Sequence, residues 1–150
     1  MIRFYRGILE EEFNEALPLI QRHWSEIAWK RDKIPLSVNK EQYLMMEEKG
    51  IIACYIGRDD GQMVAYALFF LMPHPHYSKT LYATNDVIYV RPESRGMTGT
   101  KFIDFIEGDL RRSGVQTILY HVKESLNWGK LLERKGFEPV DKVWQKWIGD

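Results

Sequence analysis

The sequence has 150 residues, of which 45% are hydrophobic and 13% aromatic, enough for one hydrophobic core and therefore for a single domain over residues 1–150. Its 21 Lys and Arg balance 21 Asp and Glu, so net charge gives no general attraction to nucleic acid or to an anionic membrane surface. No segment approaches the ~18 consecutive apolar residues of a spanning helix, and the charged N-terminal stretch is not typical of a signal peptide or an anchor.

The first ninety residues predict a strand, two helices and a three-stranded antiparallel meander. Apolar residues alternate in the first segment, recur at helical spacing in the second, and form continuous β-branched or aromatic runs later. Asp59-Asp60-Gly61 joins two of those runs and indicates a hairpin. The expected elements are a strand at 2–8, helices at 10–28 and 40–49, and strands at 51–58, 63–72 and 80–90.

The remaining residues predict a strand between two helices, followed by one or two terminal strands. We expect a helix at 98–112, a strand at 117–122, a helix at 126–135, and the terminal strands within 137–148. The resulting order is β-α-α-β-β-β-α-β-α-β. This order indicates an α+β domain, with a mostly antiparallel mixed sheet flanked by helices.

The single cysteine, Cys54, falls in an apolar run that is typical of a buried strand. It has no second cysteine with which to form an internal disulfide, so we expect a reduced, cytoplasmic protein. His74 and His76 lie close together in a Pro-His-Pro-His loop. That loop contains no Cys, Asp or Glu to complete a ligand set, and we predict no metal site.

Residues 87–102 read Val-Ile-Tyr-Val-Arg-Pro-Glu-Ser-Arg-Gly-Met-Thr-Gly-Thr-Lys-Phe and place a glycine-containing turn between a strand and a helix. Such a turn points free backbone N–H groups and the positive end of a helix dipole at one spot, which suits a pyrophosphate. The segment and the element order resemble the GNAT acetyltransferases and their CoA-binding motif. Two of the usual glycine places, three and five residues after Arg95, hold Thr98 and Thr100 here.

The resemblance implies acetyl-CoA as co-substrate and an α+β GNAT fold. In that family the turn holds the pyrophosphate, while the backbone of the preceding strand holds the pantetheine arm and polarises the thioester carbonyl. The implied pyrophosphate residues are Arg95, Gly96, Met97, Thr98, Gly99 and Thr100. The implied pantetheine and thioester residues are Ile88, Tyr89 and Val90.

A second segment, Leu-Leu-Glu-Arg-Lys-Gly-Phe-Glu at 131–138, resembles the late helix of the same family. In many members a tyrosine in this stretch protonates the departing thiolate, but Leu132 occupies that place here. Ser125 is the nearest polar substitute for the general acid, and water is the alternative. Asn127, in the same region, is implied to contact the pantetheine.

Asp86 is the first candidate for the general base, because a strand carboxylate in apolar surroundings has a raised pKa. His76 is its rival, because imidazole titrates near neutrality. The family resemblance places the acceptor wall near Trp29 and Arg31. We expect further acceptor contacts from Tyr82 and Asn85, which share a strand with Asp86.

The resemblance predicts an N-acetyltransferase that acts by direct attack of a primary amine, either on a small molecule or on a protein. Two alternatives stay open. The first is a GNAT-like protein that modifies a nucleobase or another macromolecule, against which the neutral charge argues; the second is a non-catalytic CoA-binding module. We expect no membrane partner and no nucleic-acid partner, and a homodimer is an open alternative.

Overall fold

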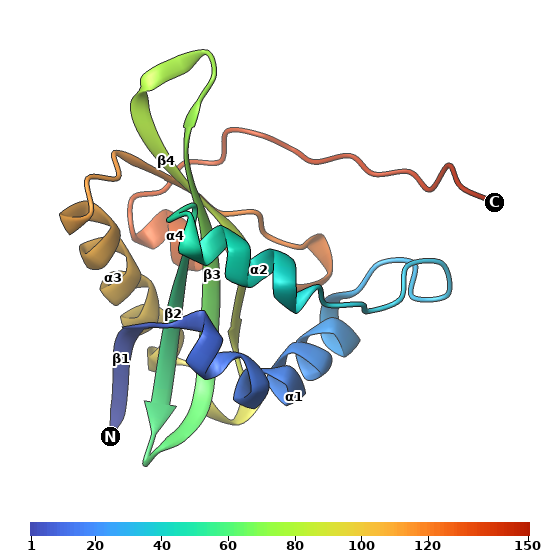
Figure 1. Cartoon of the computed structure of the whole chain (residues 1–150), viewed down its shortest axis with the longest axis horizontal. Coiled ribbons are helices and arrows are strands. Elements are labelled where there is room, and N and C mark those ends of the chain that lie inside the picture. The colour runs from blue at the N-terminus through green and yellow to red at the C-terminus, as the bar shows by residue number, and fades with distance from the viewer.

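Five strands form one mixed sheet in the order β1-β2-β3-β4-β5 in the computed structural model, which describes all 150 residues (Figure 1). Strands β1 to β4 pair antiparallel, and β5 pairs parallel to β4. The strands are β1 (Ile2–Gly7), β2 (Ile52–Asp59), β3 (Gln62–His74), β4 (Tyr77–Val90) and β5 (Thr117–Leu119). The helices are α1 (Leu9–Ile27), α2 (Lys40–Glu48), α3 (Met97–Arg112) and α4 (Gly129–Arg134), with 3-10 turns η1 (Pro92–Ser94) and η2 (Glu124–Leu126).

Each face of the sheet carries its own hydrophobic core, because the central strands are buried on both sides. On β2, Ala53 and Tyr55 pack with the α3 residues of one core, whereas Cys54 and Ile56 pack with the α1 residues of the other. This division follows the two-residue period of a strand. Helix α3 therefore covers one face, and α1 with α2 covers the opposite face.

The turn between β2 and β3 has the conformation that its sequence predicts. Asp60 has φ 47° and Gly61 has φ 84°, and positive φ at both central residues is typical of a two-residue hairpin with the native strand twist. The predicted hairpin is thus confirmed.

A side chain of α2 stabilises the beginning of α1. The Glu47 carboxylate accepts hydrogen bonds from the backbone N–H groups of Leu9 at 2.5 Å and Glu10 at 3.4 Å. These donors have no partner inside their own helix, so the contact fixes α2 against α1. None of the helices is both long and apolar enough to cross a membrane.

The C-terminal third differs from the sequence expectation in three places. Strand β5 ends at Leu119 rather than near residue 122, because it separates there from β4. Helix α4 begins at Gly129, whose N–H is capped by the Asn127 side chain at 2.9 Å. The predicted terminal strands within 137–148 are wrong: this segment lies beside no strand that could complete its backbone hydrogen bonds.

Candidate functional site at the separation of β4 and β5

Strands β4 and β5 pair over only three residues each, and their pairing ends at Thr84 and Leu119. The buried Asn85 side chain takes over from the ladder at this point. Its Oδ1 accepts from the His121 N–H at 2.6 Å, and its Nδ2 donates to the His121 carbonyl at 3.4 Å. The Asn85 side chain thus bridges the two backbone segments and keeps them farther apart than paired strands. Residues 86–90 have no strand beside them on the β5 side.

Two backbone amides of β4 point into the opening beyond Asn85. The Arg91 N–H donates to the Val64 carbonyl of the preceding strand at 2.9 Å, and amides alternate in direction along an antiparallel strand. Ile88 and Val90 therefore direct their N–H groups away from β3, as the sequence analysis requires of thioester contacts. By the same alternation the Tyr89 amide faces β3, so it does not point into the opening as the sequence analysis expected.

Asp86 is the extra residue of a β-bulge, since the β3–β4 register moves from Leu68↔Val87 to Phe69↔Asn85. Its Oδ2 accepts a hydrogen bond of 2.5 Å from the Tyr43 hydroxyl of α2. Burial raises the pKa of Asp86, and the hydrogen bond from Tyr43 opposes that shift. A partly buried carboxylate with a raised pKa can accept a proton from an amine.

An apolar cavity of about 130 Å³ lies between the sheet and helices α1 and α2. Tyr43 and Val87 line it, so it adjoins the Asp86 carboxylate. Every lining residue except Glu12 is hydrophobic; the set is Leu9, Glu12, Phe13, Ala16, Ile20, Leu36, Val38, Tyr43, Cys54, Ile56, Tyr66, Leu68 and Val87. Leu36 and Val38 come from the segment between α1 and α2.

The predicted acceptor residues Trp29 and Arg31 lie in that same segment but do not line the cavity. The Arg31 guanidinium packs 5.8 Å from the Trp24 ring and donates to the Ser25 carbonyl, and Lys30 lies over Trp29. Leu36 and Val38 of this segment line the cavity instead. The sequence alone does not reveal this, because nothing in an aperiodic segment shows which side chains turn inward.

The turn between β4 and α3 presents free donors on an open surface. Gly96 has φ 98°, and the N–H groups of Met97, Thr98 and Gly99 donate to no protein acceptor. A Cβ at Gly96 or Gly99 would meet no atom within 4 Å. Free amides, a helix N-terminus and unfilled space above the glycines together fit a pyrophosphate. The partly buried Thr98 and Thr100 lie on this turn among the predicted cofactor residues.

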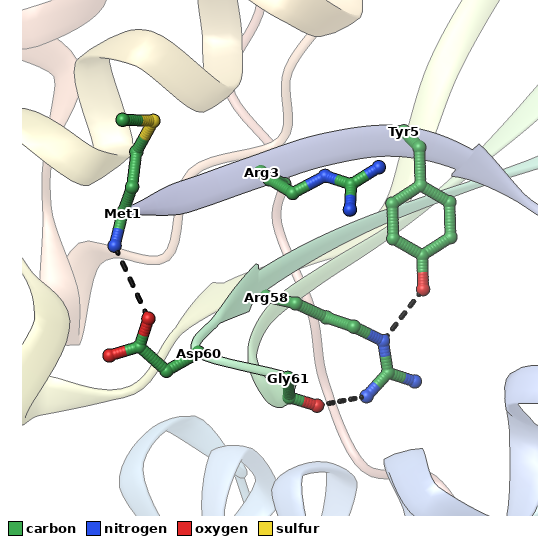
Figure 2. A pocket seen from close by; sticks show the side chains of 6 residues that line it. All are labelled: Met1, Arg3, Tyr5, Arg58, Asp60 and Gly61. Atoms are coloured by element: carbon green, nitrogen blue, oxygen red, sulfur yellow. Dashed lines mark hydrogen bonds and ion pairs between the residues drawn. The ribbon is translucent and has the colours of Figure 1, made fainter.

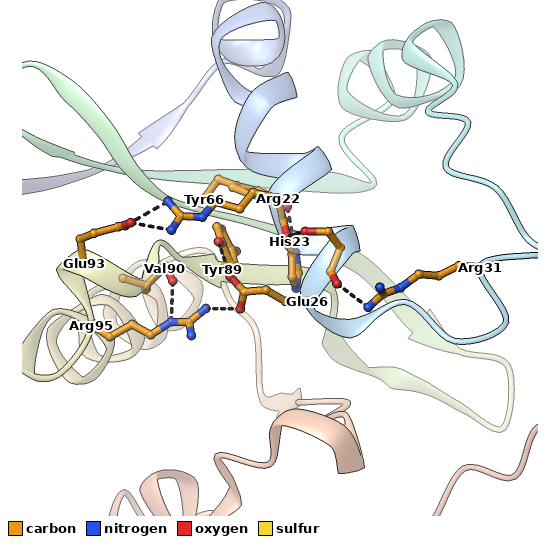
Figure 3. Close-up of polar contacts among 10 residues, drawn as sticks. Arg22, His23, Glu26, Arg31, Tyr66, Tyr89, Val90, Glu93 and Arg95 are labelled. Carbon is orange, nitrogen blue, oxygen red and sulfur yellow. Dashed lines mark hydrogen bonds and ion pairs between the residues drawn. The ribbon is translucent and has the colours of Figure 1, made fainter.

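Arg95 belongs to an ion-pair network that ties the turn to α1 (Figure 3). Its Nη2 donates to Glu26 Oε2 at 2.7 Å and its Nε to the Val90 carbonyl at 2.9 Å. Arg22, one turn earlier on α1, pairs with Glu93 at 2.5 Å. Burial alone would raise the pKa of Glu26, but hydrogen bonds from Arg95 and Tyr89 lower it. Arg95 thus positions the turn and shares its charge with Glu26.

His23 of α1 lies buried beneath this network and was not identified from the sequence. Its ring stacks on Tyr89 at a centroid distance of 4.6 Å, and its Nδ1 lies 2.9 Å from the Tyr66 hydroxyl. The Tyr89 hydroxyl donates to Glu26 at 2.8 Å. Burial lowers the pKa of His23 from 6.5 to about 4, so it is a neutral support for the end of β4.

His76 lies at the tip of the β3–β4 hairpin, which extends beyond the body of the sheet (Figure 1), whereas Tyr82 lies within the sheet and pairs with Thr117 of β5. His74 lies 5.5 Å from His76 and 6.2 Å from Tyr82 between ring centroids. Ten residues of extended strand separate His76 from Asp86, roughly 30 Å. The structure therefore does not bring the rival base to the opening, and the Tyr82 ring packs near His74 and Tyr77 of the hairpin.

The segment after β5 carries the remaining predicted residues. Ser125 is exposed in η2, and Asn127 caps α4 through the contact with Gly129. Leu132 is buried. Tyr120 has a buried hydroxyl with no hydrogen-bond partner, packed against Trp128 at 5.4 Å. Ser125 is thus an exposed hydroxyl on the turn that follows β5.

A larger hollow of about 540 Å³ lies at the opposite edge of the sheet, along β1 and the β2–β3 turn (Figure 2). Arg58 lines it, but the guanidinium already donates to Tyr5, Gly61, Glu12 and Glu15. These acceptors neutralise its charge. Arg3 also lines the hollow, and its guanidinium has no acceptor within the chain, but no helix begins here as one does at the turn before α3.

The sequence matches the family model described as the Acetyltransferase (GNAT) family over residues 9–137. No curated protein matches it. The matched range includes both the β4–α3 turn and the late helix.

Solved structures with the same fold include a predicted acetyltransferase with acetyl-CoA from Clostridium acetobutylicum, with TM-score 0.72, 12% identity, and coverage of 99% of this chain and 97% of that one. A ribosomal-protein-alanine N-acetyltransferase from Brucella melitensis has TM-score 0.69, 16% identity, and coverage of 100% and 99%. An aminoglycoside acetyltransferase from an uncultured soil metagenomic sample, in complex with trehalose, has TM-score 0.75, 12% identity, and coverage of 99% and 95%. These similarities establish the fold.

The environment of His23 predicts a pH dependence of stability. Since its pKa is about 4 in the folded chain and 6.5 in the reference state, only the unfolded chain binds a proton between these values. The free energy of unfolding should therefore fall as pH drops from 6.5 to 4, by on the order of 3 kcal/mol. The free energy of unfolding, measured by urea denaturation at each pH, should depend less steeply on pH in His23→Phe than in the native chain. In the control His74→Gln, at an exposed site, its dependence on pH should equal that of the native chain. Equal slopes for His23→Phe and native protein would contradict the assignment.

Proposed function

The chain belongs to the GNAT acetyltransferase family, and we propose that it transfers the acetyl group of acetyl-CoA to a primary amine by direct attack. It is an acyltransferase, and acetyl-CoA is the acyl donor as in the family. One observation carries the proposal: three features lie along residues 86–90 of β4. They are the outward N–H groups of Ile88 and Val90, the Asp86 carboxylate with its raised pKa, and the apolar cavity that Val87 lines.

The donor half of the proposal uses the backbone of this chain. The free amides at the beginning of α3 bind the pyrophosphate, and the opening between β4 and β5 takes the pantetheine. The N–H groups of Ile88 and Val90 donate to the thioester carbonyl oxygen, where negative charge develops during attack. Bound acetyl-CoA supplies the activated acyl group.

The acceptor half uses Asp86, which takes the proton of the incoming amine while Tyr43 orients the carboxylate. Ser125 or a water molecule returns a proton to the thiolate, because Leu132 cannot. Direct transfer is favoured over a covalent enzyme intermediate, since Cys54 is buried and burial raises its pKa to about 12.

The lining of the cavity suggests which amines are accepted. The one charged lining residue, Glu12, is already paired with Arg58 and Tyr5. A charged group placed in the cavity would therefore lose its hydration without gaining a free partner, whereas an apolar group would fill the space favourably. We therefore infer that the acceptor is an amine with a small apolar substituent, on a small molecule or at an exposed position of a polypeptide.

The hydrogen bond between Tyr43 and Asp86 predicts the direction of a change in the pH profile. Tyr43→Phe removes a donor that stabilises the charged carboxylate, so the pKa of Asp86 should rise and the acidic limb of kcat should move to higher pH. Asp86→Asn should lower kcat by at least about 100-fold. Tyr77→Phe, at the exposed hairpin tip, is the control. An acidic limb that stays in place in Tyr43→Phe would pass the role of base to another group.

The space above Gly99 predicts separate effects on folding and on acetyl-CoA binding. The substitution Gly99→Val places a Cβ that meets no protein atom within 4 Å, and Val suits a helix at least as well as Gly does. The stability of the chain without ligand should therefore be unchanged. The added side chain should obstruct the pyrophosphate and weaken binding at least about tenfold, or 1.4 kcal/mol. Thermal unfolding with acetyl-CoA at 100-fold its Kd should show stabilisation of about 2.7 kcal/mol in the native chain and in Gly108→Ala. An equal acetyl-CoA affinity in Gly99→Val would remove the turn from the binding site.

The cavity also predicts a reversal of acceptor preference. Leu36→Glu places a carboxylate on the cavity wall, so kcat/KM should fall for hexylamine and rise for 1,6-diaminohexane, each by about tenfold or more, in a released-thiol assay. Ile34→Glu is a matched control, because Ile34 is 37% exposed and Leu36 39% exposed on the same segment, but only Leu36 lines the cavity. The same change of preference in both variants would show that the cavity does not receive the acceptor.

A further inference from the structure

The apolar cavity has a polar group on its wall that the mechanism above does not use, the hydroxyl of Tyr66 on β3. Tyr66 is only 3% exposed and lines the cavity together with Tyr43. Its hydroxyl has a single hydrogen-bond partner in the chain, the Nδ1 atom of His23 at 2.9 Å (Figure 3). A hydroxyl offers one proton and two lone pairs, so this contact does not use all of its hydrogen-bonding capacity.

The neutral state of His23 decides which capacity remains at Tyr66. Burial lowers the pKa of His23 to about 4, so the ring carries one N–H at neutral pH and its other nitrogen can only accept. Either the Tyr66 O–H donates to Nδ1, or an Nδ1–H donates to the Tyr66 oxygen. In both arrangements the oxygen keeps at least one lone pair, with which it can accept a hydrogen bond from a donor in the cavity.

Tyr66 lies at the level of β4 at which the acetyl group is transferred. It is the antiparallel partner of Tyr89, the residue after Ile88, whose N–H points into the opening. Burial raises the pKa of Tyr66, and the nearby Tyr89 and Asp86 raise it further. The hydroxyl therefore stays protonated at neutral pH and lies close to the general base. Tyr66 can bind the acceptor, but it does not take its proton.

The Asp86 carboxylate has one oxygen left for the same amine. Its Oδ2 accepts from the Tyr43 hydroxyl, while its Oδ1 has no donor in the chain. An incoming nitrogen thus finds two acceptors, Oδ1 of Asp86 and the oxygen of Tyr66. An uncharged primary amine has two N–H groups and one lone pair, which match these two acceptors and the thioester carbon.

We propose that Tyr66 positions the acceptor amine and, together with Asp86, selects primary over secondary amines; the inference rests on the proposed function. One N–H donates to Tyr66 and the other to Asp86, which directs the nitrogen lone pair at the thioester carbon. As the N–C bond forms, one N–H proton passes to Asp86, and the C–S bond breaks with its electron pair on sulfur. The product amide keeps one N–H, which stays on Tyr66. A secondary amine has only one N–H and leaves one of the two acceptors without a donor.

The native chain tests this selection without any substitution. In a released-thiol assay, kcat/KM for hexylamine should exceed that for N-methylhexylamine by about tenfold or more, because a site built around two N–H groups disfavours an amine that lacks one. Equal kcat/KM for the two amines would overturn the proposal. A native chain that releases no thiol with either amine would instead remove the acceptor assigned under the proposed function, and the role of Tyr66 with it.

The variant Tyr66→Phe separates hydrogen bonding from the bulk of the N-methyl group. Its kcat/KM for hexylamine should fall about fivefold or more, whereas its kcat/KM for N-methylhexylamine should change less than about twofold, since the single N–H of that amine donates to Asp86. The control Tyr55→Phe removes a buried hydroxyl on the opposite face of the sheet, which donates to Asp109 at 2.8 Å. It should keep the amine preference of the native chain. Equal losses for both amines in Tyr66→Phe would show that this hydroxyl only supports the fold, and would overturn its role in selection.

Discussion

The Asn85 side chain holds β4 and β5 apart at the point where their ladder ends, and the geometry of the site depends on this contact. A further backbone pair would bring the strands to the normal sheet spacing and occupy the outward amides of Ile88 and Val90. A buried amide that both accepts from and donates to His121 satisfies the backbone without closing the gap. The bulge at Asp86 follows on the other edge of β4, which pairs with β3. The neighbouring residues Asn85 and Asp86 thus mark two sides of the proposed site, the side for acetyl-CoA and the side for the amine.

Helix α1 balances the charge at the turn before α3. Glu26 neutralises much of the charge of Arg95 and also accepts from Tyr89, so the free positive potential at the turn comes chiefly from the backbone amides and the dipole of α3. An anion bound there would compete with Glu26 for Arg95. The neutral His23 beneath Tyr89 adds no charge to this balance, which suits a support whose protonation would disturb the network.

The elements that could be predicted from sequence are those whose signal is local. Asp60-Gly61 fixes its own turn, the glycine-containing stretch before α3 fixes the free amides, and Asp86 stands out as a carboxylate on an apolar strand. Contacts between distant segments gave no such signal. The partner of Arg95 lies 69 residues away on α1, and whether Trp29 or Leu36 faces the cavity is decided by packing against the sheet. His76 looked chemically suitable, but the length of the hairpin removes it from the opening.

The C-terminal segment shows the limit of such local signals. Its apolar, β-branched and aromatic residues favour a strand, but a strand also needs a neighbour for its backbone groups. One chain holds both an unpaired segment and an unpaired edge without joining them. The strand prediction was therefore wrong because no strand lies beside the segment, although its residues favour the strand conformation. The open edge belongs to β5, which is also the outer wall of the cofactor opening. The pairing of this edge therefore affects the shape of the site as well as the sheet.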